Sequence, residues 1–221
     1  ARLARTAFFL LGPIVLLGGW MTFIHRHYGV WSPTVMSGFS LVQHTGAWFE
    51  FLPDEQAALR DTYLRFRDER LAERGNQTNT IWDAIPELSR ASGLGFYDLS
   101  RELQRLSLQL IRDRPLLYAR SALDGWIAFW KAPVYWDPAL VSLPWLAGIG
   151  RAAAMIGRVV CLAANAAFLM ASLLAVASRS IRRRLRREAL LLASAAAIWV
   201  TSIVQTLIDH GDNPRFLIPL Q

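Results

Sequence analysis

Hydrophobic residues gather in three long runs along the chain, separated by a long mixed segment and by a short basic one. The runs Thr6–Ile24 and Val159–Ala177 have 19 residues each and Ala189–Ile208 has 20, and none of them contains a charged side chain. A helix of about 20 apolar residues crosses the ~30 Å hydrocarbon core of a bilayer. The pattern therefore predicts three transmembrane helices.

The segment between the first two runs has the periodicity of short amphipathic helices. Apolar residues recur at helical spacing in 53–74 and in 98–112, and no long stretch alternates as a strand does. Aromatic residues cluster in 126–145, which is typical of the boundary between membrane and water. We therefore expect an all-α integral membrane protein with three transmembrane helices. A mainly helical, partly interfacial domain over residues 25–148 would separate the first from the second.

The basic residues are concentrated beside the apolar runs. The chain has a net charge of +7, 53% hydrophobic residues and 19% charged residues, whereas soluble domains average ~45–50% and ~25%. Basic and acidic residues are equal in number over 25–157, and the positive excess comes from Arg2, Arg5 and an arginine cluster within 178–188. This is the positive-inside pattern of membrane proteins. The basic residues have no interleaved aromatic residues, so no nucleic-acid partner is expected.

This charge distribution predicts the orientation of the protein in its membrane. The helix over 1–24 starts in the cytoplasm, and the arginine-rich loop 178–188 lies there as well. The domain over 25–148 and the tail over 209–221 are then extracytoplasmic. Residues 149–208 form a hairpin of two transmembrane helices, and membrane lipids are expected partners.

Candidate catalytic and metal-binding residues are few. Cys161 is the single cysteine and lies within the second apolar run, which excludes a disulfide framework and disfavours a nucleophile. His25 and His27 form an H-x-H pair with no third ligand at suitable spacing, so no metal site is predicted. His44 precedes Thr45-Gly46 in a polar turn that either lines a site or ends a helix.

The most suggestive polar residues lie just after the third run. Residues 209–216 place His210, Asn213 and Arg215 with two aspartates on a turn that contains a glycine and a proline. Arginine is suited to binding phosphate through two hydrogen bonds, and the phosphate of a lipid-linked group lies at this depth of the membrane. The alternative is an ordinary turn in which Arg215 pairs with Asp212.

Three motifs together resemble a known family. They are Tyr28-Gly29-Val30-Trp31 with Gly38-Phe39-Ser40-Leu41 and His44-Thr45-Gly46, the segment from Leu106 to Tyr118 that leads to Ile127-Ala128-Phe129-Trp130, and the stretch from Gly211 to Pro219. In this order and topology the chain resembles the C-terminal half of a bacterial GT-C glycosyltransferase. Protein mannosyltransferases and the aminoarabinose transferases of lipid A belong to this group of integral membrane enzymes.

The resemblance implies an enzyme of the bacterial inner membrane that transfers a sugar from a polyprenyl-phosphate or similar lipid donor to an extracytoplasmic acceptor. The family's catalytic carboxylate lies in an outer loop near the protein's N-terminus, so no catalytic residue is assigned in this chain. The chain would contribute elements of the donor pocket and of a lid. Arg215, Asn213 and His210 are candidates for the donor phosphate, and His44 and Tyr28 for the acceptor or lid. A divalent metal is a possible cofactor.

Two other classes of function stay open. One is a non-catalytic membrane-anchored module, such as a sensor or scaffold whose outer domain binds a partner. The other is a transporter or channel, which is disfavoured because the predicted transmembrane helices carry almost no ionisable residues.

Overall fold

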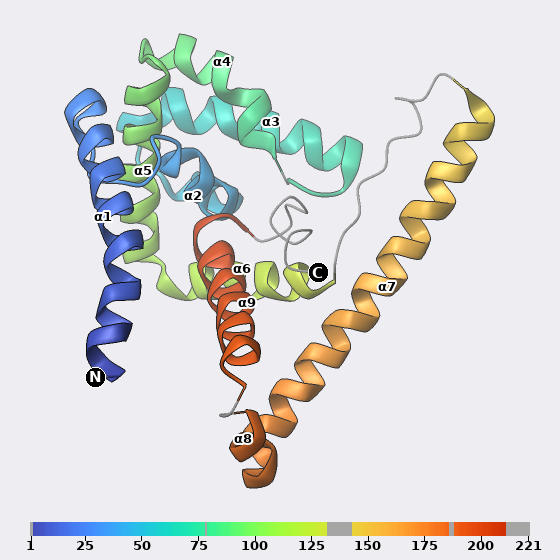
Figure 1. The fold of residues 1–221 in the computed structure, drawn as a ribbon. Coiled ribbons are helices and arrows are strands. Elements are labelled where there is room, and N and C mark those ends of the chain that lie inside the picture. The colour runs from blue at the N-terminus through green and yellow to red at the C-terminus, as the bar shows by residue number, and fades with distance from the viewer. Residues whose placement is uncertain (1, 78, 132–142, 186–187, 211–221) are drawn as a thin grey trace. The chain divides into compact units, whose positions relative to one another are not determined.

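The computed structural model describes residues 2–77, 79–131, 143–185 and 188–210 (Figure 1). Over these residues every regular element is a helix and there is no strand, which confirms the predicted all-α class. The chain divides into two compact units, Ala1–Pro115 and Leu116–Gln221. The two units, called unit 1 and unit 2, are described separately.

Unit 1 consists of helices joined by short connections. In chain order they are α1 (Arg2–Tyr28), α2 (Ser37–Thr45), η1 (Gly46–Phe51), η2 (Asp54–Gln56), α3 (Ala57–Arg74), α4 (Thr80–Ser92) and α5 (Phe96–Asp113), where η denotes a 3-10 helix. Helix α3 ends where the sequence predicts, because Gly75 has a φ of +69°. Its N–H donates to the Leu71 carbonyl at 2.9 Å, which closes the last turn.

The core of unit 1 is built around α5. The predicted leucine stripe of this helix is buried, with Leu99, Leu103 and Leu106 at 0% exposure and Leu110 at 3%. Fully or almost fully buried side chains from α2, η1, α3 and α4 complete the core: Phe39, Val42, Phe49, Tyr63, Ile81 and Leu88. Burying one side chain of this size contributes roughly 1.5–3 kcal/mol, so α5, with four buried leucines, contributes more to the core than any other helix of unit 1.

Small residues allow α2 to approach α5 closely. A Cβ added to Gly38 would lie 1.8 Å from the backbone oxygen of Ser100, and the Gly38 N–H donates to the Ser100 hydroxyl at 3.3 Å. Two turns further along both helices, the buried hydroxyls of Thr45 and Ser107 are 2.8 Å apart and share a hydrogen bond. The two helices are therefore joined at two contacts that only small side chains permit.

Two helices in the described part of the chain are long and apolar enough to cross a membrane. They are Trp145–Ala177, within α7 (Pro144–Ala177), and Ala189–Ile208, which is all of α9. The third predicted run coincides with α9, whereas α7 begins well before the predicted Val159 because Pro144 occupies its first turn. Helix α1, which contains the first predicted run, is not one of the two, so its membrane crossing stays a prediction.

Unit 2 contains α6 (Pro115–Trp130), α7, α8 (Arg179–Leu185) and α9. The short helix α8 lies within the predicted loop 178–188. The side chain of Arg182 donates to the carbonyls of Ala175 and Val176 at the end of α7. This basic residue therefore binds carbonyl groups that the end of a helix leaves without an intrahelical partner.

An aromatic cluster connects α6 with α7 and α9 inside unit 2. Trp130 is 8% exposed and stacks on Phe168, with ring centroids 5.8 Å apart. Asn165, the polar residue of the second apolar run, donates to the Trp130 carbonyl at 3.0 Å. The sequence placed 126–145 at the membrane boundary. Within that segment the structure buries Trp130 in the unit's own core and leaves Trp145 63% exposed.

Candidate functional site

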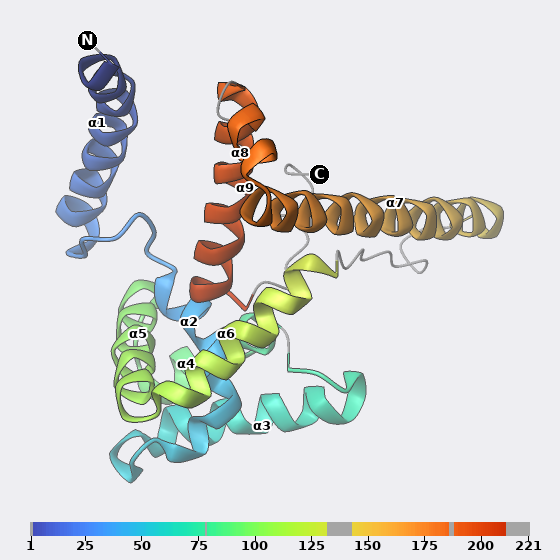
Figure 2. The ribbon, with the colours of Figure 1, turned by 90° about the horizontal axis from the view of Figure 1, so that it is seen from below.

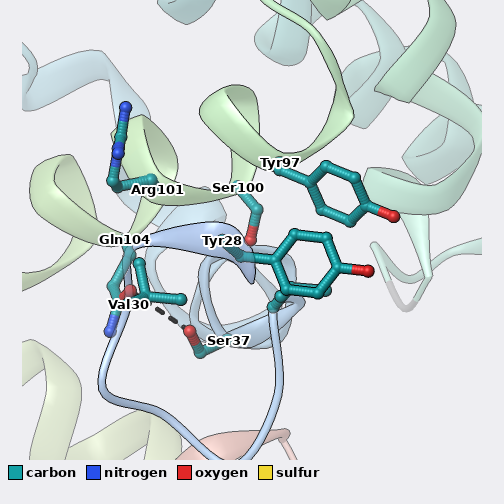
Figure 3. A pocket seen from close by; sticks show the side chains of 8 residues that line it. Tyr28, Val30, Ser37, Tyr97, Ser100, Arg101 and Gln104 are labelled. Carbon is teal, nitrogen blue, oxygen red and sulfur yellow. Dashed lines mark hydrogen bonds between the residues drawn. The ribbon is translucent and has the colours of Figure 1, made fainter. Parts of the chain in front are cut away.

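Tyr28, predicted to lie near an acceptor or lid, lines a small pocket of unit 1 (Figure 3). The pocket is formed by the end of α1, the loop that follows it, the start of α2 and the first three turns of α5. Its lining residues are Tyr28, Val30, Val35, Ser37, Tyr97, Ser100, Arg101 and Gln104. The enclosed space holds about one water molecule, so the pocket is a shallow recess rather than a cavity for a whole sugar.

Two tyrosine rings form one wall of this recess. The rings of Tyr28 and Tyr97 are 4.5 Å apart between centroids and are tilted by 47°. A hydrogen bond with Tyr97, followed by the charge that Tyr97 acquires on ionisation, raises the pKa of the Tyr28 phenol above its ordinary value. The raised pKa keeps the Tyr28 phenol protonated at neutral pH, so it can donate a hydrogen bond to an oxygen atom of a ligand.

Hydroxyl, amide and guanidinium groups line the rest of the recess. The Ser37 hydroxyl donates to Gln104 Oε1 at 3.2 Å, a bond drawn in Figure 3. The Arg101 guanidinium forms an ion pair of 2.7 Å with Asp98, and the Arg101 side chain stays 59% exposed. Aromatic faces beside several hydrogen-bond donors suit a ligand with both apolar ring faces and hydroxyl groups.

His44 does not belong to this recess. It lies in α2, one residue before that helix ends, and its exposure is 0%. The residues beside it are also part of the core: Thr45 shares the hydrogen bond with Ser107, and a Cβ on Gly46 would lie 2.3 Å from the Tyr63 hydroxyl. The structure therefore does not bring His44 and Tyr28 into one site.

The predicted donor-phosphate residues lie at the C-terminal end of the described part of the chain or beyond it. His210 is the last described residue of unit 2, while Asn213 and Arg215 lie outside the described residues. The His210 backbone approaches α6 closely, because a Cβ on Gly125 would lie 2.3 Å from the His210 oxygen. One turn earlier the Tyr118 hydroxyl donates to the Leu207 carbonyl at 2.6 Å, and burial raises the pKa of Tyr118.

Over the described residues no three His, Cys, Asp or Glu side chains gather as a metal site would require. The two histidines of the H-x-H pair have different neighbours. The ring of His25 stacks on Trp31 with centroids 4.5 Å apart, and that of His27 packs 4.1 Å from the ring of Phe23.

The sequence analysis missed the residues that α5 contributes to the recess. Tyr97, Ser100, Arg101 and Gln104 have the spacing i, i+3, i+4 and i+7, which places them on one helix face. This face borders the leucine stripe, whose spacing predicts a core and not a site. The polar spacing beside it was the signal that could have identified the site.

Comparison of the chain with protein-family models, with curated proteins and with solved structures gave no significant match. The inference of function therefore depends on the recess at Tyr28 and on the apolar helices.

Proposed function

We propose that this chain is part of a membrane glycosyltransferase that transfers a sugar from a lipid-phosphate donor to an extracytoplasmic acceptor. Unit 1 contributes the recess at Tyr28 as the binding site for the acceptor. The observation that supports this assignment most directly is the composition of the recess, where hydrogen-bond donors surround two phenol rings. Sugar rings present the matching combination of apolar ring faces and hydroxyl groups.

The size of the recess indicates how an acceptor would bind. Because its interior holds about one water molecule, a sugar ring lies across the opening rather than inside it. Tyr97 is 48% exposed and the Arg101 side chain 59%, so both can contact such a ring from the rim. The Tyr28 ring and the Ser37 hydroxyl are also part of the lining. This geometry best fits an acceptor glycan that binds through the single sugar ring at its end.

The chemistry is a single displacement at the anomeric carbon of the donor. An acceptor hydroxyl forms the new C–O bond, the bond to the lipid phosphate breaks, and a carboxylate takes the hydroxyl proton. The family resemblance assigns that carboxylate to a loop outside this chain. The residues of this chain would hold the acceptor at Tyr28, while Arg215, Asn213 and His210 would contact the donor phosphate.

We place the protein in a bacterial inner membrane with a defined orientation. Helix α1 crosses the membrane with α7 and α9, unit 1 beyond α1 is extracytoplasmic, and the loop 178–188 is cytoplasmic. The uncharged run of α1 and the arginines at both cytoplasmic segments support this arrangement.

The test is a matched pair of arginine substitutions on α5 in the full-length protein. Arg101 lines the recess, whereas Arg105, one turn later, pairs with Glu102 at 2.6 Å and does not line it. A hydrogen bond from a charged group contributes about 1.5–3 kcal/mol, so Arg101→Ala should raise the acceptor KM roughly 10- to 100-fold. Arg105→Ala should leave it unchanged.

The assay follows release of polyprenyl phosphate from a polyprenyl-phosphate-linked mannose or aminoarabinose by protein in lipid nanodiscs. Equal effects of Arg101→Ala and Arg105→Ala would remove the recess from the acceptor site. If the full-length protein binds glycan at the recess but transfers no sugar, the membrane-anchored binding module is the correct class instead.

A further inference from the structure

The loop between α1 and α2 does not lead directly away from the end of α1. Gly29 adopts a φ of +73° and its N–H donates to the His25 carbonyl at 2.9 Å, so the chain reverses direction there. The Trp31 ring then stacks on His25 at 4.5 Å, and the Trp20 indole N–H donates to the Pro33 carbonyl at 2.7 Å. The loop therefore runs back alongside the last turns of α1 (Figure 2).

This reversal brings the loop to the level where the apolar run of α1 ends. Trp20 is eight residues before Tyr28, so the Pro33 carbonyl meets the side chain of a residue whose Cα lies ~12 Å before the end of the helix at 1.5 Å per residue. The uncharged run continues to Ile24, ~6 Å beyond Trp20 on the same scale. If α1 crosses the membrane, Trp31 and Pro33 therefore lie beside the outer end of its apolar run, at the level of the head groups.

The composition of the loop suits that position. No charged residue occurs from Gly29 to Phe49, whereas charged residues are frequent from Glu50 onward. Two backbone N–H groups of the loop are satisfied locally, since Thr34 N–H donates to the Ser32 hydroxyl at 3.4 Å and Met36 N–H to the Thr34 hydroxyl at 3.1 Å. Local bonding of this kind lowers the cost of moving a loop out of bulk water.

The large side chains of this region lack a protein cover. Trp31 is 62% exposed, Trp20 49% and Met36 37%. They continue the exposed apolar surface of α1, on which Ile14 and Leu16 are 63% and 76% exposed. Tryptophan has a strong preference for the head-group region, where its ring and its N–H are both accommodated.

We propose that residues 29–36 form a membrane-surface anchor that inserts Trp31, Pro33 and Met36 into the head-group region of the outer leaflet. The occupant of this surface is lipid, because the patch continues the uncharged run Thr6–Ile24 of α1, which has membrane-spanning length, and presents the exposed rings of Trp20 and Trp31. The anchor fixes the recess at Tyr28 beside the bilayer, where a lipid-linked donor would present its phosphate. This inference rests on the proposed membrane crossing of α1 and not on sugar transfer.

The experiment measures depth at three positions of the full-length protein in phosphatidylcholine vesicles. A cysteine-free background, in which Cys161 of this chain and any cysteines elsewhere in the full-length protein are replaced by alanine, allows one fluorophore at a time to be attached at Pro33→Cys, Leu16→Cys or Glu73→Cys. The exposed Pro33 side chain can be replaced without removing the carbonyl that Trp20 binds. Glu73 is an exposed residue of α3 and serves as the aqueous reference. Quenching is compared between aqueous iodide and lipids with a nitroxide at the head group or deep in the acyl chain.

We expect iodide quenching at position 33 to be several-fold weaker than at position 73, and the head-group nitroxide to quench position 33 most strongly. Position 16 should respond to the deep nitroxide. Adding Trp31→Asp should return position 33 to the iodide accessibility of position 73. Water-like quenching at position 33 with a deep position 16 would overturn the anchor while leaving the membrane crossing of α1 in place. Water-like quenching at both positions would overturn the crossing and the anchor together.

Discussion

Adding a single methyl group at Gly38 should strongly destabilise unit 1. A Cβ at this site would lie 1.8 Å from the Ser100 oxygen and 2.8 Å from the Gln104 nitrogen. Both are backbone atoms of α5, so no side chain can move aside to relieve the contact. Real Cβ contacts are essentially never below 3.0 Å, so Gly38→Ala must separate α2 from α5 by at least about 1.2 Å locally.

The cost follows from what the two helices bury between them and the rest of the core. A radial gap of ~0.5–1 Å forfeits a quarter to a half of the dispersion energy of each contact it opens. Overpacking of a dense core costs ~1–3 kcal/mol and sometimes more. Because the displacement is larger than that gap and involves backbone, we expect Gly38→Ala to lower the free energy of unfolding of unit 1 by about 3 kcal/mol.

The assay is proteolysis of the purified protein in detergent micelles across a urea series. With an m-value of ~1–3 kcal/mol per molar, the loss should lower the midpoint by about 1 M or more. Gly95→Ala is the matched control, since Gly95 has a φ of −70° and a Cβ there meets nothing within 4 Å. Because Gly95 is the N-cap of α5, where alanine is less favourable than glycine by about 1 kcal/mol or less, Gly95→Ala should lower the midpoint much less than Gly38→Ala. If Gly38→Ala and Gly95→Ala unfold at the same urea concentration, the close contact of α2 with α5 is refuted.

Two further predictions concern buried hydroxyl groups of the same unit. Thr45→Val leaves the buried Ser107 hydroxyl without its partner at 2.8 Å, so it should lower the free energy of unfolding by about 1–3 kcal/mol in the same urea series. Adding Ser107→Ala should recover part of this loss, and no recovery would contradict the hydrogen bond between the two hydroxyls. Burial raises the pKa of Tyr63 well above its ordinary value of 10.0. Above pH 10 the phenol therefore ionises in the unfolded chain before it does so in the folded protein. The stability that Tyr63 contributes is complete below pH 10 and is lost as the pH rises further. Between about pH 10 and pH 12 the free energy of unfolding of the wild type should therefore fall by up to ~1.4 kcal/mol per pH unit more than that of Tyr63→Phe. Equal falls for the two proteins in urea series at these pH values would contradict the raised pKa.

The candidate site was only partly predictable from sequence. Tyr28 was proposed from the family resemblance, and it does line a recess. His44 was proposed from that resemblance and from its place in a polar turn that would line a site or end a helix. Its side chain is fully buried and lies at the end of α2, because α2 packs into the core. Tyr97 and Arg101 were overlooked, although their helical spacing was visible beside the leucine stripe.

The sequence by itself determined the helical class, the extent of α9 and the leucine face of α5. These features depend on local periodicity and on the length of apolar runs, which a chain expresses without reference to its other parts. The start of α7 was less predictable, because a helix can extend beyond the apolar run that marks its membrane-crossing part.

Only the tertiary structure decided which residues meet. The contact of Gly38 with Ser100 joins positions 62 residues apart, and the reversal after Gly29 returns Pro33 to Trp20. Such contacts depend on close packing of specific small residues and on one backbone conformation with positive φ. Periodicity predicts which face of a helix is buried, but it contains no information about the partner, so the recess at Tyr28 exists only once α1, α2 and α5 have packed.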